Sequence, residues 1–284
     1  MKEKIMFLPD LLKGKRILVT GGGTGLGKIM TRRFMELGAE PIIVGRRENV
    51  LEETANELAS ETAGRISWRG LDIRDAEAVE AVVDNIWLDG PVDVLLNNAA
   101  GNFLARTETL SHRAVDAIIA IVLHGTSYMT LACGKRWIAE KHAGNVLSIV
   151  TTYAWTGSGY VVPSAMAKAG VLAMTRSLAV EWGRKGIRLN AIAPGPFPTK
   201  GAWDRLVPSK QMADHLESRI PLGRVGDNQE LADLAAYLVC DGSAYINGEV
   251  VTIDGGEWIA GAGQFNFAAA LSDDDWAKFS PPKK

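Results

Sequence analysis

The chain has little cysteine and no pattern of metal ligands. Cys133 and Cys240 are the only cysteines among 284 residues, and they lie far apart in the sequence. No Cys-x-x-Cys pair occurs, so neither a disulfide framework nor a zinc site of that spacing is predicted. Both cysteines lie in apolar helical patterns, which favours buried thiols in a reducing compartment. We expect no metal site.

An excess of charge of one sign and long hydrophobic runs are also missing. The 31 Lys and Arg residues nearly balance the 33 Asp and Glu residues, so no basic field indicates nucleic-acid or membrane binding. The apolar run within residues 1–9 is too short for a secretory signal, and no run approaches the length of a membrane span. We therefore expect a cytoplasmic protein with neither nucleic acid nor membrane among its partners.

What the sequence does contain is an alternation of apolar strand-like runs with helical patterns. The expected strands are Arg16–Thr20, Pro41–Gly45, Ile66–Leu71, Val92–Asn97, Asn145–Thr151, Ile187–Ala193 and Val250–Ile253. This alternation predicts an α/β fold with a doubly wound parallel sheet, because helices then cover both sheet faces. We expect a single domain over residues 1–284, with an N-terminal arm at 1–14, a substrate lid at 203–222 and a C-terminal tail at 261–284.

A glycine-rich turn links the first expected strand to the first expected helix. Its glycines Gly21, Gly25 and Gly27 are spaced G-x-x-x-G-x-G, which differs from the G-x-G-x-x-G fingerprint because Leu26 occupies the last small position. Glycines allow close approach to a pyrophosphate, and a helix N-terminus presents unpaired N–H groups. A tight turn alone would explain the glycines, but their position in a βαβ unit favours nucleotide binding.

The second and third strands end on residues that discriminate between dinucleotides. Gly45 stands where an NAD site would have a carboxylate for the ribose hydroxyls, and Arg46 follows it. A guanidinium can bind a 2′-phosphate, so the pattern predicts NADP. Arg47 fits a solvated helix start better than a phosphate ligand. Asp72 could accept a hydrogen bond from the adenine amine or cap the loop, and the sequence leaves both open.

Several motifs in order make the chain similar to the short-chain dehydrogenase/reductase family. They are Thr20–Gly27, Asn97–Gly101, Lys168, Pro194–Pro196 and Asp254–Gly256. The resemblance implies a Rossmann-type sheet of seven strands and a homotetramer. In that family a catalytic tyrosine lies four residues before the lysine.

The position four residues before Lys168 is occupied here by Ser164, and the nearest upstream tyrosines are Tyr160 and Tyr153. Ser164 and Lys168 share one helix face because they are four residues apart. A chain that keeps the lysine and moves the phenol is expected to carry out different chemistry from an alcohol dehydrogenase.

Within the family, the chain resembles the NADPH-dependent 2,4-dienoyl-CoA reductases. The resemblance is carried by Asn97–Phe103, Ile121–Thr126, Thr156–Ser164 and the Pro194–Pro196 turn followed by Thr199–Ala202. It implies that Asn102 and Tyr153 hold the thioester carbonyl of an acyl-CoA substrate, while Lys168 binds the nicotinamide ribose and Ser164 reaches the same region.

The resemblance also implies two larger sets of residues. Those expected at the cofactor are Gly21, Gly23, Thr24, Gly25, Leu26, Gly27, Arg46, Asp72, Ile73, Asn98, Ala99, Ala100, Lys168, Pro194, Gly195, Pro196 and Phe197. Those expected at the acyl-CoA are Arg74, Phe103, Ser111 and Arg205. The expected reaction reduces a 2,4-dienoyl-CoA to a 3-enoyl-CoA with NADPH, in the oxidation of unsaturated fatty acids.

Two departures from the family pattern keep other functions open. Val122 stands where most members have an asparagine, so the usual lysine-linked water relay lacks its side chain, and His124 replaces an asparagine common in the dienoyl-CoA reductases. One alternative is a 2-enoyl-CoA reductase, or a carbonyl reductase that uses Tyr160 or Tyr153. The other is an NADP-binding interaction protein that has lost catalysis, which the change to Ser164 would fit.

Overall fold

One parallel sheet organises the whole protein. The computed structural model describes residues 7–200, 203, 207 and 209–279. Seven strands pair in parallel in the order β3-β2-β1-β4-β5-β6-β7. They are β1 (Arg16–Thr20), β2 (Glu40–Gly45), β3 (Ser67–Gly70), β4 (Val94–Asn97), β5 (Gly144–Ile149), β6 (Ile187–Pro194) and β7 (Val250–Ile253). The predicted doubly wound, seven-stranded parallel sheet is confirmed.

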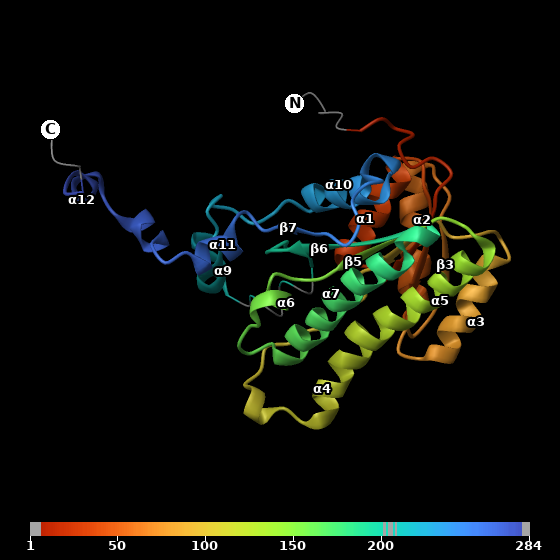
Figure 1. Cartoon of the computed structure of the whole chain (residues 1–284), viewed down its shortest axis with the longest axis horizontal. Coiled ribbons are helices and arrows are strands. Elements are labelled where there is room, and N and C mark those ends of the chain that lie inside the picture. The colour runs from red at the N-terminus through yellow and green to blue at the C-terminus, as the bar shows by residue number, and fades with distance from the viewer. Residues whose placement is uncertain (1–6, 201–202, 204–206, 208, 280–284) are drawn as a thin grey trace.

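Helices cover both faces of this sheet, as Figure 1 shows. On one face lie α1 (Gly25–Glu36), α2 (Glu48–Thr62) and α10 (Asn228–Val239), and on the other lie α3 (Ala76–Trp87), α5 (Gly125–Glu140) and α7 (Val162–Trp182). Each layer has its own core, with Phe34 and Leu231 in the first and Trp137 and Trp182 in the second. Because the central strands are buried on both faces, their sequences are mostly apolar rather than alternating, whereas the edge strand β3 is only partly buried.

The longest helical stretch in the described chain combines three elements. The helix α4 (His112–Ile119) continues through a π-helical turn η2 (Ala120–His124) into α5. By length and composition His112–Glu140 could cross a membrane, since its most apolar 18-residue window has a mean hydropathy of 1.5. Half of that window is buried in the fold, and Trp137 of α5 is fully buried with its indole N–H donating to Val92 O. This burial is that of a core helix.

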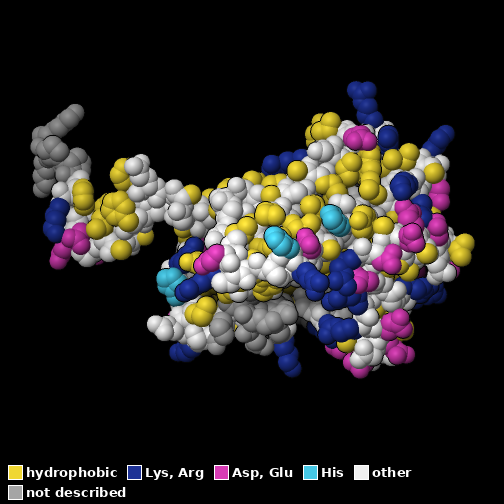
Figure 2. Space-filling view, turned by 90° about the horizontal axis from the view of Figure 1, so that it is seen from below, with side chains coloured by type: hydrophobic (Ala, Val, Ile, Leu, Met, Phe, Trp, Pro, Cys, Tyr) yellow, Lys and Arg dark blue, Asp and Glu magenta, His cyan; other side chains and the backbone are white. Residues whose placement is uncertain are grey.

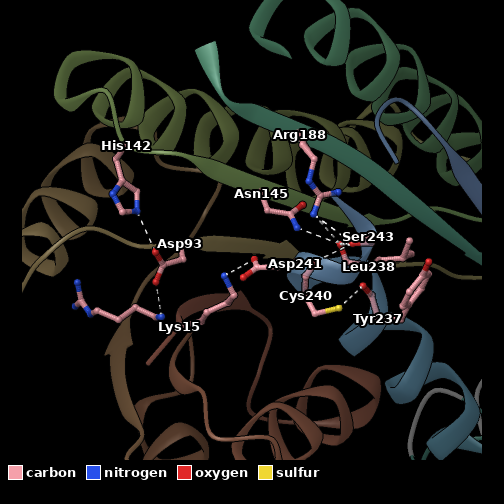
Figure 3. Close-up of polar contacts among 11 residues, drawn as sticks. Lys15, Asp93, His142, Asn145, Arg188, Tyr237, Leu238, Cys240, Asp241 and Ser243 are labelled. Atoms are coloured by element: carbon pink, nitrogen blue, oxygen red, sulfur yellow. Dashed lines mark hydrogen bonds and ion pairs between the residues drawn. The ribbon is translucent and has the colours of Figure 1, made fainter. Parts of the chain in front are cut away.

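Polar contacts link the amino ends of the central strands to one another and to the C-terminus of α10 (Figure 3). Asp93, just before β4, accepts from Arg16 N at 2.8 Å and lies 3.0 Å from His142 Nε2. Asn145 of β5 and Arg188 of β6 both donate to Leu238 O, at 3.0 and 3.4 Å. At the amino edge of the sheet these polar groups are therefore used in hydrogen bonds within the fold. In open α/β sheets, ligands bind at the opposite edge, where the strands have their carboxyl ends.

The two ends of the described chain differ. Residues 7–14 of the expected N-terminal arm pack on the first core, where Leu12 is fully buried and donates its N–H to Leu37 O. The tail projects from the body in Figures 1 and 2 and exposes aromatic side chains, among them Phe265 and Trp276. It forms short helical segments, α11 (Glu257–Ala262), η5 (Asn266–Ala270) and α12 (Asp273–Ala277). A capping box between Ser272 and Asp275 begins α12.

The close contact between α5 and α7 depends on Gly134. A Cβ at this position would overlap the ring of Trp182. We expect Gly134→Ala to lower the free energy of unfolding by about 1–3 kcal/mol, because overpacking outweighs alanine's helix preference of about 1 kcal/mol. Urea unfolding measures this change. The matched control is Gly261→Ala in α11, where an added Cβ meets nothing within 4 Å; equal stability of the two variants would contradict the packing argument.

Candidate functional site

A pocket opens at the carboxyl ends of β1, β2 and β4. It has a volume of about 330 Å³ and is lined by the glycine turn after β1, by the residues after β2 and β3, and by Asn98, Ala99 and Ala100 after β4. Gly21 has φ of +67°, which a residue with a side chain rarely adopts, and a Cβ at Gly27 would overlap the Gly21 carbonyl oxygen. The turn is thus shaped to bring its backbone close to a ligand at the start of α1.

Thr20 and Asn98 join the glycine turn to the end of β4. The Thr20 hydroxyl oxygen accepts from the backbone N–H groups of Asn98 and Ala99, both at 3.0 Å. In return, Asn98 Nδ2 donates to Thr20 O at 3.0 Å and to Gly21 O at 3.3 Å. These four hydrogen bonds join two pocket walls and fix their relative register.

The far end of the pocket carries basic residues and one carboxylate. Arg46 and Arg47 line it together with Asp72. Asp72 accepts hydrogen bonds from the guanidinium and backbone N–H of Arg74, and these contacts, assisted by the charge of Arg46, hold the pKa of Asp72 below its usual value. Arg74, expected at the acyl-CoA, thus pairs with a residue expected at the cofactor. Arg47 lines the pocket too, and it is exposed at the N-cap position of α2, as the solvated helix-start interpretation predicts.

Three polar side chains converge beside the long helix α7. Asn102 Nδ2 donates to Tyr153 Oη at 3.4 Å, and Tyr153 Oη lies 3.1 Å from Ser164 Oγ. Asn102 Oδ1 accepts from Phe103 N at 2.9 Å, which turns the amide so that its N–H₂ faces the phenol. Tyr153 begins a one-turn helix, α6 (Tyr153–Thr156), which follows β5. The phenol, carboxamide and hydroxyl therefore come from three separate segments.

Lys168 lies one helical turn after Ser164 and is almost completely buried. Its Nζ donates to Ile149 O, the only hydrogen bond of this ammonium among the described residues. Burial lowers the pKa of Lys168 to about 8, since no carboxylate compensates for the lost solvent. An ammonium in such a setting has unused donor capacity for a ligand with hydroxyl groups.

Other predicted residues make different contacts. Phe103, whose N–H donates to Asn102, packs its side chain on the small cluster around Val122 and Ile118. Ser111 caps α4 by accepting from Ala114 N at 3.2 Å. Pro196 and Phe197 line a second, smaller cavity with Arg224 and Glu230 rather than the main pocket. Arg205 lies outside the described residues, as do residues 204, 206 and 208 of the predicted lid 203–222, while the helix α9 (Lys210–Ser218) forms the second half of that segment.

Sequence reasoning missed part of the pocket wall. The additional lining residues are Val44, Gly45, Arg47, Val50, Leu51, Leu71, Ile121 and Thr199. Several flank predicted positions and could have been found from them, whereas Val50 and Leu51 depend on where α2 lies. Thr151 Oγ1, directly after β5, is buried with no hydrogen-bond partner in the described part of the chain. Such an unpaired group fits a ligand bound over this strand end.

Tyr160, the other phenol considered from the sequence, is placed differently from Tyr153. Its side chain is 65% exposed and its backbone has φ of +67°. Its carbonyl oxygen accepts from Ala105 N at 2.9 Å, which ties together the loops that follow β4 and β5. The structure thus gives Tyr153, and not Tyr160, the polar contacts with Asn102 and Ser164.

Comparison with known proteins identifies the family. The model of a family described as "Enoyl-(Acyl carrier protein) reductase" matches residues 21–257. The chain is 43% identical over 271 residues to a Caenorhabditis elegans protein named "Probable 2,4-dienoyl-CoA reductase 3 [(3E)-enoyl-CoA-producing]", covering 93% of this chain and 88% of the relative. It is 42% identical over 250 residues to a Bacillus subtilis protein named "Probable 2,4-dienoyl-CoA reductase [(2E)-enoyl-CoA-producing]", covering 87% and 98%.

A solved structure shares the architecture. It is an Agrobacterium tumefaciens protein described as "a putative 2-deoxy-d-gluconate 3-dehydrogenase" with bound NADP, which is 31% identical and has a TM-score of 0.81. The match covers 89% of this chain and the whole of that structure. The sequence motifs, the seven-stranded sheet and these matches agree, and the chain is an oxidoreductase that belongs to the short-chain dehydrogenase/reductase family, with similarity to proteins named 2,4-dienoyl-CoA reductases.

Proposed function

We propose that this protein reduces 2,4-dienoyl-CoA thioesters with NADPH and produces 3-enoyl-CoA. The observation that carries the proposal is the convergence of Asn102 and Tyr153, two hydrogen-bond donors 3.4 Å apart, next to the helix that holds Lys168. Two converging donors suit one oxygen atom that gains negative charge. The names of the C. elegans and B. subtilis relatives point to the same substrate class.

NADP is the dinucleotide that we propose for the pocket. Gly45 offers no carboxylate to a ribose, and Arg46 lines the pocket directly after it. The related Agrobacterium structure was solved with bound NADP. The glycine turn would hold the pyrophosphate, and Lys168 would donate to the hydroxyls of the nicotinamide ribose.

When bound, NADPH supplies the hydride that reduces the far end of the diene. The protein's task is then to stabilise the charge that appears on the thioester oxygen. Tyr153 O–H and Asn102 N–H₂ would donate to that oxygen. Tyr153 Oη and Ser164 Oγ share a hydrogen bond in which either group can be the donor, and with Ser164 donating the phenolic proton is directed at the substrate. In sites of this type, loss of one such donor costs roughly 3–4 kcal/mol of transition-state stabilisation.

Protonation of the resulting dienolate decides the product. A proton taken from water at the carbon next to the carbonyl gives 3-enoyl-CoA, and protonation two carbons further along gives 2-enoyl-CoA. The two named relatives differ on this point, and we propose the 3-enoyl product of the C. elegans protein. Turnover in D₂O followed by NMR of the product tests the proposal, since deuterium at the carbon next to the carbonyl supports it and deuterium at the distal carbon contradicts it.

The arrangement favours this reaction over reduction of a ketone. A carbonyl reductase needs a phenol one helical turn before the lysine, and Ser164 occupies that position. Tyr153 has hydrogen-bond partners suited to holding a charged oxygen. NADPH consumption with a 2,4-dienoyl-CoA, measured against a panel of ketones, separates the two activities.

We also propose that the protein works as a cytoplasmic homotetramer. The described parts of α5 and α7 expose apolar side chains, namely Leu131, Met166 and Val180. Exposed apolar residues on adjacent helices suit contact with another copy of the chain.

The first kinetic prediction concerns the two proposed donors. We expect Tyr153→Phe to lower kcat about 10²–10³-fold without changing NADPH affinity, because a donor to the developing charge is removed. Asn102→Ala should have an effect of similar size. Stopped-flow or steady-state loss of diene absorbance measures both. The control is Tyr160→Phe, which alters an exposed phenol in the same segment; full turnover by Tyr153→Phe would refute the donor role.

The second prediction concerns the choice of dinucleotide. Arg46→Ala should weaken NADPH binding about 10- to 100-fold and leave the weaker binding of NADH unchanged, because a charge-assisted contact to the 2′-phosphate is lost. Fluorescence titration with each dinucleotide measures the ratio. Arg47→Ala is the matched control, and we expect a smaller effect because Arg47 lies one residue further from the end of β2, at the N-cap position of α2. An equal loss of NADH binding would contradict the assignment.

The third prediction concerns pH. With a pKa of about 8, Lys168 is mainly charged below pH 8 and mainly neutral above it. An anionic dinucleotide favours the charged form, so binding raises this pKa, and affinity falls as pH rises through 8 by up to about tenfold per pH unit. Titration of the apo protein with NADPH between pH 7 and 9.5 measures the slope. In Lys168→Met the affinity should be weaker and this slope absent; an unchanged slope would rule out Lys168 as its source.

A further inference from the structure

Tyr153 lies on a helix too short to be stable by itself. The helix α6 spans only Tyr153–Thr156, and Gly157 ends it with φ of +70°. A single helical turn fixes several backbone dihedrals for one hydrogen bond and is unstable without tertiary contacts. The phenol therefore depends on side chains that hold α6 in place.

One contact that holds α6 in place comes from α11, about a hundred residues later in the chain. The rings of Trp155 in α6 and Trp258 in α11 are stacked, with centroids 5.1 Å apart and an interplanar angle of 20°. Trp155 also packs on the cluster that contains Val171 of α7. Trp155 thus lies between the core and a second aromatic ring, two residues from the phenol.

The backbone around Trp258 is itself fixed. Asp254, at the end of β7, accepts from Gly256 N at 2.9 Å and from Trp258 N at 2.8 Å through its two carboxylate oxygens. Trp258 is therefore attached to the sheet by short hydrogen bonds. It forms a firm support against which α6 can rest.

We propose that Trp258 is a positioning residue for Tyr153: its ring clamps Trp155, and the clamp keeps the Tyr153 hydroxyl between Asn102 and Ser164. This rests on the function proposed above, in which that hydroxyl stabilises the thioester oxygen. Trp258 acts through α6 and does not itself need to touch substrate.

The same turn also reaches the end of the predicted lid. Leu222 N donates to Gly255 O at 3.3 Å, and Arg219 lies 3.6 Å from Glu257. Two residues that precede Trp258 along the turn thus contact the segment 219–222. A displacement of residues 219–222 would therefore act on the turn that holds Trp258, and through the Trp155–Trp258 stack on Tyr153.

The character of the contact predicts which substitutions it tolerates. Trp258 Nε1 is buried without a hydrogen-bond partner within the described ranges, so the indole contributes its aromatic face and not its N–H. A phenylalanine at this position keeps an aromatic face, whereas a leucine does not. Trp258→Phe should consequently preserve the clamp better than Trp258→Leu.

The kinetic test compares Trp258→Leu and Trp258→Phe with wild type in 2,4-dienoyl-CoA reduction. We expect Trp258→Leu to lower kcat about 10- to 100-fold with unchanged NADPH affinity, since small displacements of a catalytic group have effects of this size. Trp258→Phe should stay within about threefold of wild type. The control is Trp276→Leu, which changes an exposed tryptophan in α12 and should leave kcat unaltered.

A double-mutant cycle separates positioning from general loss of structure. In the Tyr153→Phe background, Trp258→Leu should cost less than about threefold, because the group it positions is already gone. If the two losses multiply, or if Trp258→Leu keeps wild-type kcat, the proposal is overturned. Should Trp258→Leu fail to fold, Trp155→Leu and Trp155→Phe probe the same stack from α6 with the same expected order.

A measurement without substrate keeps this inference distinct from the proposed reaction. Five tyrosines labelled as 3-fluorotyrosine give separate ¹⁹F signals, and Tyr153→Phe assigns one of them. We expect Trp258→Leu to shift or broaden that signal, while Trp276→Leu leaves it in place. An unaltered Tyr153 signal would refute the clamp. If the wild type does not reduce dienoyl-CoA while the signal still moves, only the proposed reaction fails.

Discussion

The site depends on one geometric constraint, the parallel direction of all seven strands. In a parallel sheet every carboxyl end lies at the same edge, so loops that are distant in sequence are brought side by side. Here the turn after β1 and the segment after β4 are held together by hydrogen bonds between Thr20 and Asn98. The pocket, the phenol of Tyr153 and the ammonium of Lys168 all lie along this edge. Antiparallel strands would distribute these groups over both edges.

A second constraint is the removal of water from the surroundings of Lys168. Its side chain is buried and has no carboxylate partner among the described residues, and Val122 in the π-helical turn is fully buried among apolar neighbours. Hydrogen bonds and charges act more strongly in such surroundings than in water. Ser164 provides a small hydroxyl where a bulky phenol would otherwise fill the space, which leaves room for Tyr153 to approach from α6. The serine at position 164 and the tyrosine at position 153 are therefore related: the phenol of Tyr153 lies against the hydroxyl of Ser164.

The sequence predicted the sheet well because its signals were local. Strand runs such as Arg16–Thr20 and Val250–Ile253 match the observed bounds. The convergence of Asn102 and Tyr153 was implied by resemblance alone, since 51 residues separate them and no periodicity links them. The one-turn helix α6, the π-helical turn and the stack between Trp155 and Trp258 could not be predicted, because each depends on contacts made only in the folded chain. Phe197 and Ser111 were predicted from the resemblance to lie at the cofactor and the acyl-CoA. In the structure Phe197 lines the second, smaller cavity, and Ser111 caps the start of α4.

The hydrogen bonds at the amino edge of the sheet have a consequence for the evolution of the sequence. Asp93, Asn145 and Arg188 hold the strand starts without taking part in the pocket, so resistance to unfolding and chemical selectivity reside at opposite rims. Loops at the reactive rim can accept new side chains while the scaffold remains intact. An architecture with this separation is well suited to acquiring new substrates by small steps, and laboratory evolution that confines diversity to the carboxyl rim would exploit it.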